Sequence, residues 1–336
     1  MISRKKYTNR QTKKITSKSK TKSKNKSSKS GLKLGCHVSI SPSILEGIQW
    51  GVSIGASAIQ LFLGSNRSAS MKTKAKPTPD EIHSIRSYIR QMNITLIIHS
   101  IYLLNFCVAG PSSGRVGYMH SNLQYDLQLG AKLGAKCVVL HLGFKKDMEP
   151  SIALGNLIAN LNKILREMPV GIQLAIETSA GQGSQVGYTL EELAVIWRGI
   201  KHHGSRKVGI CIDTAHIFVS GYDISTPEGI KSYLARFNEL IGWKHITNFH
   251  INDSRFAVGS RKDEHRGIGS GLIFHGKSGH DALKYLIKFC NTHQIPMILE
   301  THSAGSPTSE GSHSGEHGYK WELNLLQGML KRGSGR

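Results

Sequence analysis

Nine potential metal ligands stand at or just beyond the ends of short apolar runs, spread over about two hundred residues of the chain. Neutral imidazole and carboxylate groups are the ligands that suit zinc and related divalent metals. Because most of the apolar runs end in this way, we expect the nine side chains to meet in one polynuclear metal site. They are His99, His141, Glu177, Asp213, His216, His250, Asp263, His265 and Glu300.

The number of ligands indicates more than one metal ion. A tetrahedral zinc takes three or four protein ligands, so nine suffice for two or three ions if one carboxylate bridges. Asp213 with His216, and Asp263 with His265, each offer two ligands on one predicted loop. A single buried His or Asp is more often a structural residue, but nine in this pattern favour a metal centre. Clustered divalent ions are typical of phosphoryl chemistry, where they activate water and stabilise the leaving oxygen.

Short β-rich runs alternate with helical stretches from residue 32 onward, and these elements would position the ligands. Strands are predicted near 32–39, 58–63, 95–100, 137–143, 172–178, 208–214, 246–253 and 296–301. Helices are predicted near 43–54, 80–92, 115–134, 151–167, 189–202, 227–241, 279–293 and 316–331. Eight such units predict an α/β fold, a (β/α)8 TIM barrel, whose functional side chains lie at the carboxyl ends of the strands.

The charge of the chain favours a polyanionic partner. The 336 residues carry a formal charge of +22, and the first 33 hold 13 Lys or Arg without a single acid. The remainder is still basic, so nucleic acid is the first candidate. Residues 1–31 have almost no apolar side chains and are predicted to be a disordered Lys/Ser-rich tail, followed by a catalytic barrel domain over 32–331. The tail is interpreted as a nucleic-acid-binding or nuclear-targeting arm, or alternatively as a solvated segment without a specific partner.

The cysteines and the apolar runs limit the location of the protein. The five cysteines lack CxxC spacing and are predicted to be buried thiols in a reducing compartment. No apolar run approaches the ~20 residues of a membrane span, and the N-terminus lacks the apolar region of a secretory signal. We therefore expect an intracellular protein, not a membrane or secreted one, with the nucleus or a viral replication compartment suggested by the basic tail.

Seven sequence motifs indicate a more specific function than the charge and the predicted fold do. They are GCHVS at 35–39, HSIYLLN at 99–105, ETSAGQGSQVG at 177–187, GICIDTAHIFVSGYD at 209–223, HINDS at 250–254, GSRKDEHRGIGSG at 259–271 and IPMILET at 295–301. With these motifs, roughly residues 32–301 resemble the endonuclease IV family of zinc-dependent apurinic/apyrimidinic endonucleases. The resemblance implies a DNA-repair hydrolase that acts in base-excision repair.

The resemblance also implies three zinc ions and assigns their ligands. The three sets are His99, His141 and Glu177; Glu177, Asp213, His250 and Glu300; and His216, Asp263 and His265. Glu177 would bridge the first two ions and is the expected catalytic residue. In the family, a hydroxide held between these two ions attacks the phosphorus 5′ of an abasic site, which leaves a 3′-hydroxyl and a 5′-deoxyribose phosphate. Removal of blocked 3′ ends is implied by the same resemblance.

Three further residues match positions that the family inserts into the DNA stack. They are Arg67, Tyr102 and Leu103, and their implied role is to extrude the abasic nucleotide. The alternative is a surface arginine and a packed Tyr–Leu pair. The implied partner is double-stranded DNA containing abasic sites, and the protein is expected to be a monomer.

The chain departs from the bacterial pattern of the family in three places. These are the basic tail, about five inserted residues within 272–279, and the 301–315 loop. His302, His313 and His317 are extra histidines there, but the set of nine ligands is complete without them. His37 is interpreted as a lining residue, and the histidines of the outer helices, among them His120, are predicted to be solvated.

Two other functions remain open at this stage. A sugar isomerase or epimerase on a related barrel would use a single metal ion and a catalytic Lys or His, and would not need a basic face. A catalytically inert DNA-binding protein would be expected to have lost some of the nine ligands, all of which are present.

Overall fold

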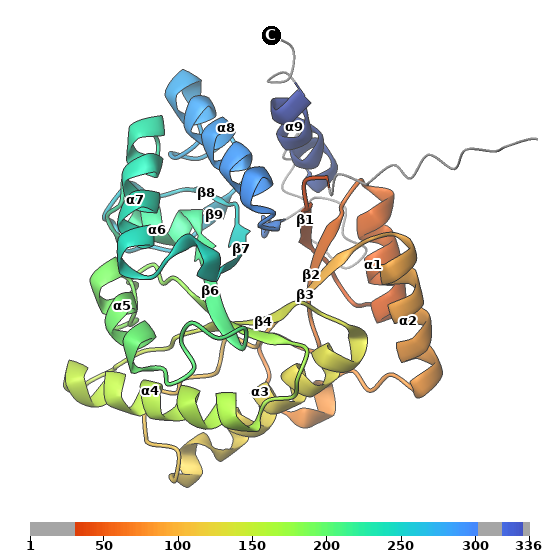
Figure 1. Cartoon of the computed structure of the whole chain (residues 1–336), viewed down its shortest axis with the longest axis vertical. Coiled ribbons are helices and arrows are strands. Elements are labelled where there is room, and N and C mark those ends of the chain that lie inside the picture. Colours follow the sequence, from red (N-terminus) through yellow and green to blue (C-terminus); the bar gives the residue numbers. More distant parts are fainter. Residues whose placement is uncertain (1–30, 302–317, 332–336) are drawn as a thin grey trace, which may run out of the picture. The chain divides into compact units, whose positions relative to one another are not determined.

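The predicted parallel barrel is the core of the structure (Figure 1), a computed structural model that describes residues 31–301 and 318–331. Its strands are β1 (Leu34–His37), β2 (Ala58–Phe62), β3 (Thr95–His99), β4 (Cys137–His141), β5 (Gln173–Glu177), β6 (Val208–Asp213), β7 (Ile246–His250) and β10 (Met297–Leu299). They hydrogen-bond in the closed order β1-β10-β7-β6-β5-β4-β3-β2. Because Gly35 of β1 pairs with both Ala58 and Ile298, the sheet has no free edge.

Helices follow the strands and surround the barrel (Figure 1). They are α1 (Ile44–Ser53), α2 (Pro79–Gln91), α3 (Gly114–Leu133), α4 (Pro150–Glu167), α5 (Leu190–Gly199), α7 (Pro227–Leu240), α8 (Gly276–His293) and α9 (Tyr319–Lys331). All eight predicted strands and all eight predicted helices are thereby confirmed, with boundaries that differ by a few residues. No helix in the described part of the chain is long and apolar enough to cross a membrane.

The start of α2 shows how local sequence determines these boundaries. Thr78 accepts a hydrogen bond from the backbone N–H of Glu81 at 3.3 Å, and the Glu81 carboxylate accepts one from the N–H of Thr78 at 2.6 Å. Pro79 occupies the first helical position, where its missing N–H costs nothing. Thr226 and Pro227 begin α7 in the same manner. Both starts were therefore readable from the sequence to within one residue.

Two small elements beside the barrel mouth were not predicted. The prediction that Asp213 and His216 share a loop is wrong, because the helix α6 (Thr214–Ser220) begins directly after β6. Asp213 caps this helix by accepting a hydrogen bond from the N–H of His216 at 3.0 Å. The second element is a two-stranded ribbon formed by β8 (Asp253–Ser254) and β9 (His265–Arg266). The described residues also form two short 3-10 helices, η1 (Met71–Thr73) and η2 (Trp243–His245).

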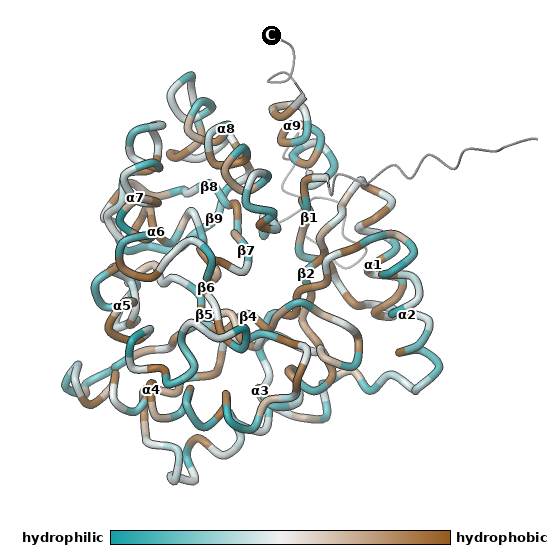
Figure 2. The backbone as a smooth tube through the Cα atoms, viewed as in Figure 1, coloured by the Kyte–Doolittle hydropathy of each residue, from teal (hydrophilic) through white to brown (hydrophobic). Residues whose placement is uncertain are grey.

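Apolar side chains fill the barrel and the space between the strands and the helices. Figure 2 shows hydrophilic and hydrophobic positions alternating along the helices, as expected when one face packs inward. All five cysteines are buried free thiols, as predicted. The layer inside the barrel consists of small or branched side chains: Ala58, Ile97, Cys137, Val139, Ala175, Cys211 and Ile298. The barrel is thus a packed scaffold, and its chemistry lies above this layer.

One histidine on α3 corrects an expectation. His120 was predicted to be solvated, but it is only 7% exposed, and its Nε2 lies 2.8 Å from Oδ1 of Asn160 on α4. Its ring packs edge-on against Phe106. Helix α3 buries several polar side chains in this way, including Asn122 and Asp126. Polarity alone therefore could not identify the outer face of this helix.

Candidate metal centre

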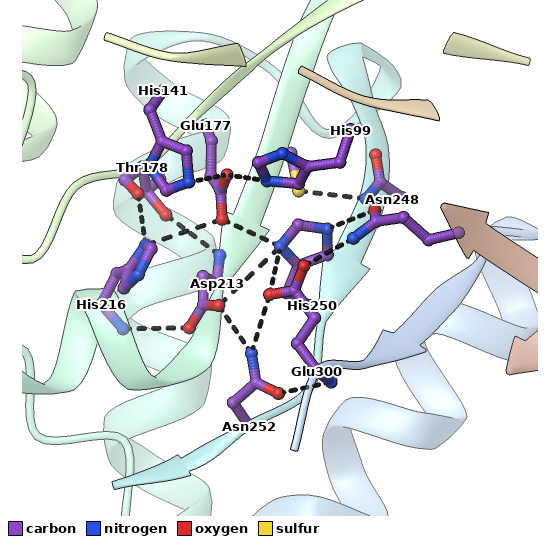
Figure 3. Close-up of polar contacts among 12 residues, drawn as sticks. His99, His141, Glu177, Thr178, Asp213, His216, Asn248, His250, Asn252 and Glu300 are labelled. Carbon is purple, nitrogen blue, oxygen red and sulfur yellow. Dashed lines mark hydrogen bonds and ion pairs between the residues drawn. The ribbon is translucent and has the colours of Figure 1, made fainter. Parts of the chain in front are cut away.

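The barrel brings all nine predicted ligands to its mouth, at the carboxyl ends of the strands. Five strands end at one of these residues: β3 at His99, β4 at His141, β5 at Glu177, β6 at Asp213 and β7 at His250. Glu300 directly follows β10, His216 lies in α6, His265 begins β9, and Asp263 lies in the segment between β8 and β9. Figure 3 shows seven of the nine side chains turned toward a common centre.

The first group consists of His99, His141 and Glu177, whose donor atoms lie within 4.8 Å of one another. Nε2 of each histidine is 3.4 Å from Oε2 of Glu177. This carboxylate oxygen is buried and lacks a hydrogen-bond partner. Nδ1 of His99 donates to the backbone carbonyl of Ser100 at 2.7 Å, which leaves the lone pair of a neutral ring on Nε2. The lone pair on Nε2 of His99 and the unpartnered oxygen of Glu177 therefore face the same small space, which one cation would fit.

The second group places three carboxylates around one histidine nitrogen. Nδ1 of His250 is 2.8 Å from Oε1 of Glu177, 3.0 Å from Oε2 of Glu300 and 3.8 Å from Oδ2 of Asp213. Asn252 supports these acids, since its Nδ2 donates to Asp213 at 2.7 Å and to Glu300 at 3.3 Å. Glu177 thus belongs to two groups, with one oxygen facing each.

The third group lies between α6 and the β8–β9 ribbon. Asp263 approaches both histidines, with Oδ2 3.1 Å from Nε2 of His216 and Oδ1 3.3 Å from Nε2 of His265. Nδ1 of His216 donates to the carbonyl of Thr178 at 2.8 Å, so a neutral ring has its lone pair on Nε2. Nε2 of His265 is buried without a hydrogen-bond partner and lies 3.6 Å from Asp213. Asp213 therefore stands between the second and third groups.

Burial and neighbouring charge determine the protonation of the cluster. Burial alone would raise the pKa of Glu177, but the imidazoles of His141 and His250 hold that pKa well below its usual range. Burial alone would lower the pKa of His265, but Asp213 and its other acidic neighbour Asp263 raise it to about 9. The buried carboxylates thus favour a positive charge inside the cluster. Protonated imidazoles can supply this charge, and a divalent cation can supply it while the imidazoles stay neutral.

The donor set fits metal ions. It combines neutral-imidazole nitrogen and carboxylate oxygen, the chemistry that zinc and its neighbours prefer. Two of its atoms, Oε2 of Glu177 and Nε2 of His265, are buried and have no hydrogen-bond partner, although other ligand atoms lie nearby. Such atoms are costly to bury unless a ligand satisfies them. Within the described residues, eight of the nine donors, together with Cys211, form overlapping groups of three or four that share Glu177 or Asp213. Three or four protein ligands is the number that one zinc ion requires.

The predicted DNA-contacting residues lie on the rim beside the first group. Tyr102 and Leu103 are each 48% exposed and lie next to each other in sequence, so the rim presents two adjacent large apolar side chains. The Tyr102 ring centroid is 5.4 Å from that of His141, and the backbone N–H of Tyr102 donates to the carbonyl of Asn66 at 3.4 Å. Asn66 precedes Arg67, which is exposed. The loops that carry the three residues are therefore in contact.

The loop between β2 and α2, which carries Arg67, is fastened to α3 by buried polar contacts. Nζ of Lys74 is 2.6 Å and 2.8 Å from the two carboxylate oxygens of Asp126, and both side chains are almost fully buried. Asn122 donates to the carbonyl of Ala69 at 2.9 Å. These contacts hold the loop in place, although it has little regular structure of its own.

Sequence reasoning missed the polar residues that surround the ligands. Asn252 contacts Asp213 and Glu300 but was seen only as part of the HINDS motif. Gln60 is fully buried and contacts His250 and Glu300. A polar side chain inside the apolar run AIQLF was the available signal for Gln60. His37 is a lining residue, in hydrogen-bond contact with Gln60, and the extra histidines at 302, 313 and 317 lie outside the described residues.

The chain is similar in sequence and fold to known proteins. The model of the xylose isomerase-like TIM barrel family matches residues 48–327. The chain is 33% identical over 279 residues to the probable endonuclease 4 of Bacillus subtilis (strain 168), covering 82% of this chain and 87% of that relative. It is 29% identical over 285 residues to the putative endonuclease 4 of Acanthamoeba polyphaga mimivirus, with coverage of 83% and 87%. Endonuclease IV from Thermus thermophilus shares the fold, with a TM-score of 0.71 at 24% identity over 89% of this chain and 99% of that one.

Proposed function

Because this chain belongs to the endonuclease IV family, whose barrel is of the xylose isomerase-like type, we propose that it hydrolyses DNA 5′ to abasic sites. The proposed products are a 3′-hydroxyl and a 5′-deoxyribose phosphate, and blocked 3′ ends are proposed as further substrates. The observation that carries the proposal is the convergence of nine His, Asp and Glu side chains. Eight of them form groups that share Glu177 or Asp213, and Asp263 joins through His216 and His265. We propose that these donors hold three zinc ions, in the sets expected from the family.

The residues of the mouth have distinct proposed roles. Bound divalent ions would lower the pKa of a water molecule toward neutrality and offset the charge that develops on the phosphate. Glu177 fixes the distance between the first and the second donor group, because one of its carboxylate oxygens faces each group. His99 and His216 are held in one orientation by the carbonyls of Ser100 and Thr178. This fixed geometry reduces the reorganisation that the reaction requires.

Selection of the damaged site is assigned to the rim. Tyr102 and Leu103 offer exposed apolar surface directly beside the first donor group. An apolar side chain that enters the stack costs least where a base is already missing, since no base has to be displaced. Arg67 in the adjoining loop adds positive charge for the phosphate backbone. The sugar isomerase alternative offers no reason for such a rim, and it needs only one of the donor groups.

A duplex with a single tetrahydrofuran abasic analogue tests the proposal. This analogue lacks the aldehyde needed for β-elimination, so incision has to be hydrolytic. We expect a nick 5′ to the analogue and a 3′-hydroxyl that a DNA polymerase extends, while an undamaged duplex of the same sequence stays intact. His141→Ala should abolish the nick, and His83→Ala, which changes an exposed histidine on α2, should preserve it. Metal-loaded protein that leaves the analogue intact would refute the proposed function.

A further inference from the structure

A buried carboxamide connects three strands directly beside the second donor group. Gln60 comes from β2 and has no exposed surface. Its Nε2 lies 2.5 Å from Oε1 of Glu300 and 3.1 Å from Nδ1 of His37, and its Oε1 lies 2.8 Å from Nε2 of His250. The side chain therefore uses both ends of its amide on residues from β1, β7 and the end of β10.

The chemistry of the partners determines which way this amide points. An ionised carboxylate only accepts hydrogen bonds, so the amide nitrogen of Gln60 must face Glu300. The amide oxygen then faces Nε2 of His250 and can only accept. Nε2 of His250 must therefore carry a proton. A neutral His250 consequently has its lone pair on Nδ1, the atom surrounded by the carboxylates of Glu177 and Glu300.

His37 is compatible with the same orientation of the Gln60 amide. The second N–H of the Gln60 amide points to Nδ1 of His37, which accepts it as a neutral imidazole. Burial lowers the pKa of His37 to about 3, so the ring is neutral at ordinary pH. The Glu300 contact thus sets the direction of the amide, and the His37 contact is satisfied by the tautomer that is protonated on Nε2.

His250 differs in this respect from two other histidines of the cluster. His99 and His216 donate from Nδ1 to the backbone carbonyls of Ser100 and Thr178. No side-chain substitution removes a backbone carbonyl. The proton position of His250 depends on a side chain instead, and this dependence can be tested by mutation.

We propose that Gln60 is the positioning residue of the second donor group. It holds the proton of His250 on Nε2 and occupies Oε1 of Glu300, so that Nδ1 of His250 and Oε2 of Glu300 are left for one cation. Gln60 binds no metal itself. Partners of this kind, which hold the ligands of a metal, typically change metal affinity about 10–100-fold when they are removed. The inference rests on the proposed metal-dependent function, because it assigns a role within that metal centre.

The substitution Gln60→Met tests the proposal, because methionine has a similar length, cannot donate a hydrogen bond to Glu300 and is only a weak acceptor for His250. The zinc-loaded full-length protein is titrated with a chelator, and the zinc that remains bound is measured. We expect one ion to leave the variant at a chelator concentration about 10–100-fold lower than in the wild type, while the other ions stay in place. In ¹⁵N NMR, the wild-type His250 ring should show a metal-bound Nδ1 and a protonated Nε2, and the Nε2 proton should exchange with water faster in the variant.

A second variant separates the two contacts of the amide. Gln60→Glu retains an acceptor for His250 but sets a carboxylate against Glu300, so it should preserve the His250 signature and still weaken zinc binding. Gln124→Met, which removes one hydrogen bond from α3 to the Ile164 carbonyl, is the matched control and should hold zinc as the wild type does.

The outcomes distinguish this inference from the proposed function. Wild-type zinc affinity in Gln60→Met, or binding of metal through Nε2 of His250, would overturn the role of Gln60 while leaving the nuclease proposal intact. Wild-type protein that holds zinc through Nδ1 of His250 but does not incise the abasic analogue would refute the nuclease proposal alone. Wild-type protein without zinc in this group would refute both.

Discussion

Glu177 is the residue at which the donor groups meet, and its two oxygens have different neighbours. Oε2 lies 3.4 Å from Nε2 of both His99 and His141, whereas Oε1 lies 2.8 Å from Nδ1 of His250. A carboxylate can serve two cations at once because each oxygen offers its own electron pairs. An amide of the same shape has one nitrogen that offers none. For metal binding at position 177, the electron pairs on both side-chain oxygens therefore matter more than the shape of the side chain.

The substitution Glu177→Gln should lower both metal content and activity. We expect fewer ions per chain by elemental analysis and a single-turnover cleavage rate reduced at least about 100-fold, since a neutral amide cannot offset two cations. Glu167→Gln, at the exposed end of α4, removes the same charge outside the site and should change neither quantity. Full zinc content and full activity in Glu177→Gln would contradict the bridging role.

Tyr102 should contribute to recognition of the lesion more than to general DNA affinity. Stacking of an aromatic ring against a base contributes about 1–3 kcal/mol, and Tyr102 is exposed enough to enter a gap in the duplex. We expect Tyr102→Ala to weaken binding to abasic duplex by about this amount, and binding to undamaged duplex by much less. Binding titrations at one salt concentration measure both. Tyr118→Ala, at a similarly exposed tyrosine on α3, is the control, and equal losses on the two duplexes would make Tyr102 a structural residue.

Among the helices and strands, the sequence predicts the barrel and the strand ends at which candidate ligands stand. Strands such as CVVLH and LAIET are short, apolar and rich in β-branched residues, and each ends in a polar side chain. Helix starts such as Thr78-Pro79 add local signals with a known physical basis. Because parallel strands of a barrel share one direction, these patterns were enough to predict that the donors gather at one end.

The missed elements have no comparable local signal. Helix α6 has seven residues, shorter than a helix that is stable on its own, so packing against the barrel determines it. The spacing of Asp213 and His216, three residues apart, fits an N-cap, but it fits a loop equally well. The direction of the Gln60 amide follows from residues that are distant in sequence, such as Glu300, and only their juxtaposition reveals it.

The buried ion pair between Lys74 and Asp126 should stabilise the loop that carries Arg67. Lys74→Met leaves the Asp126 carboxylate buried without its partner, and removal of one member of such a pair costs about 3–5 kcal/mol. Urea unfolding of the metal-loaded protein measures the free energy of unfolding. Lys72→Met, on the exposed face of the same loop, is the control and should change it by less than about 0.5 kcal/mol. Equal values for the two variants would show that the pair does not hold the loop.

Positive charge is unevenly distributed along the chain. Twelve Lys or Arg and no acid lie within residues 1–31, of which 1–30 are outside the described part of the chain, while the formal charge of the full chain is +22. Charge of this kind acts on any phosphate backbone and does not discriminate between sequences. Affinity for undamaged DNA and chemistry at the lesion should therefore be separable.

Deletion of residues 1–31 should reduce salt-dependent binding without reducing the chemical rate. Each neutralised phosphate contributes about −0.9 to the slope of log affinity against log salt on duplex DNA, so we expect the slope to become shallower by roughly 3–6. The single-turnover rate at saturating protein should be nearly unchanged, because all nine ligands lie beyond residue 98. Binding at several salt concentrations tests the first expectation. An unaltered slope would favour a targeting role, and a lost rate would contradict the proposed domain boundary at residue 32.

The closure of the barrel between β1 and β10 also has a consequence for how the protein is made. These two strands pair directly, yet they are separated by about 260 residues of chain. A ribosome that adds about 5–20 residues per second needs on the order of 10–50 s to synthesise that distance. During this time β1 lacks one neighbour, and Glu300, the last donor, has not yet emerged. We therefore expect the second donor group to capture its metal only after β10 and Glu300 have been synthesised and β10 has paired with β1.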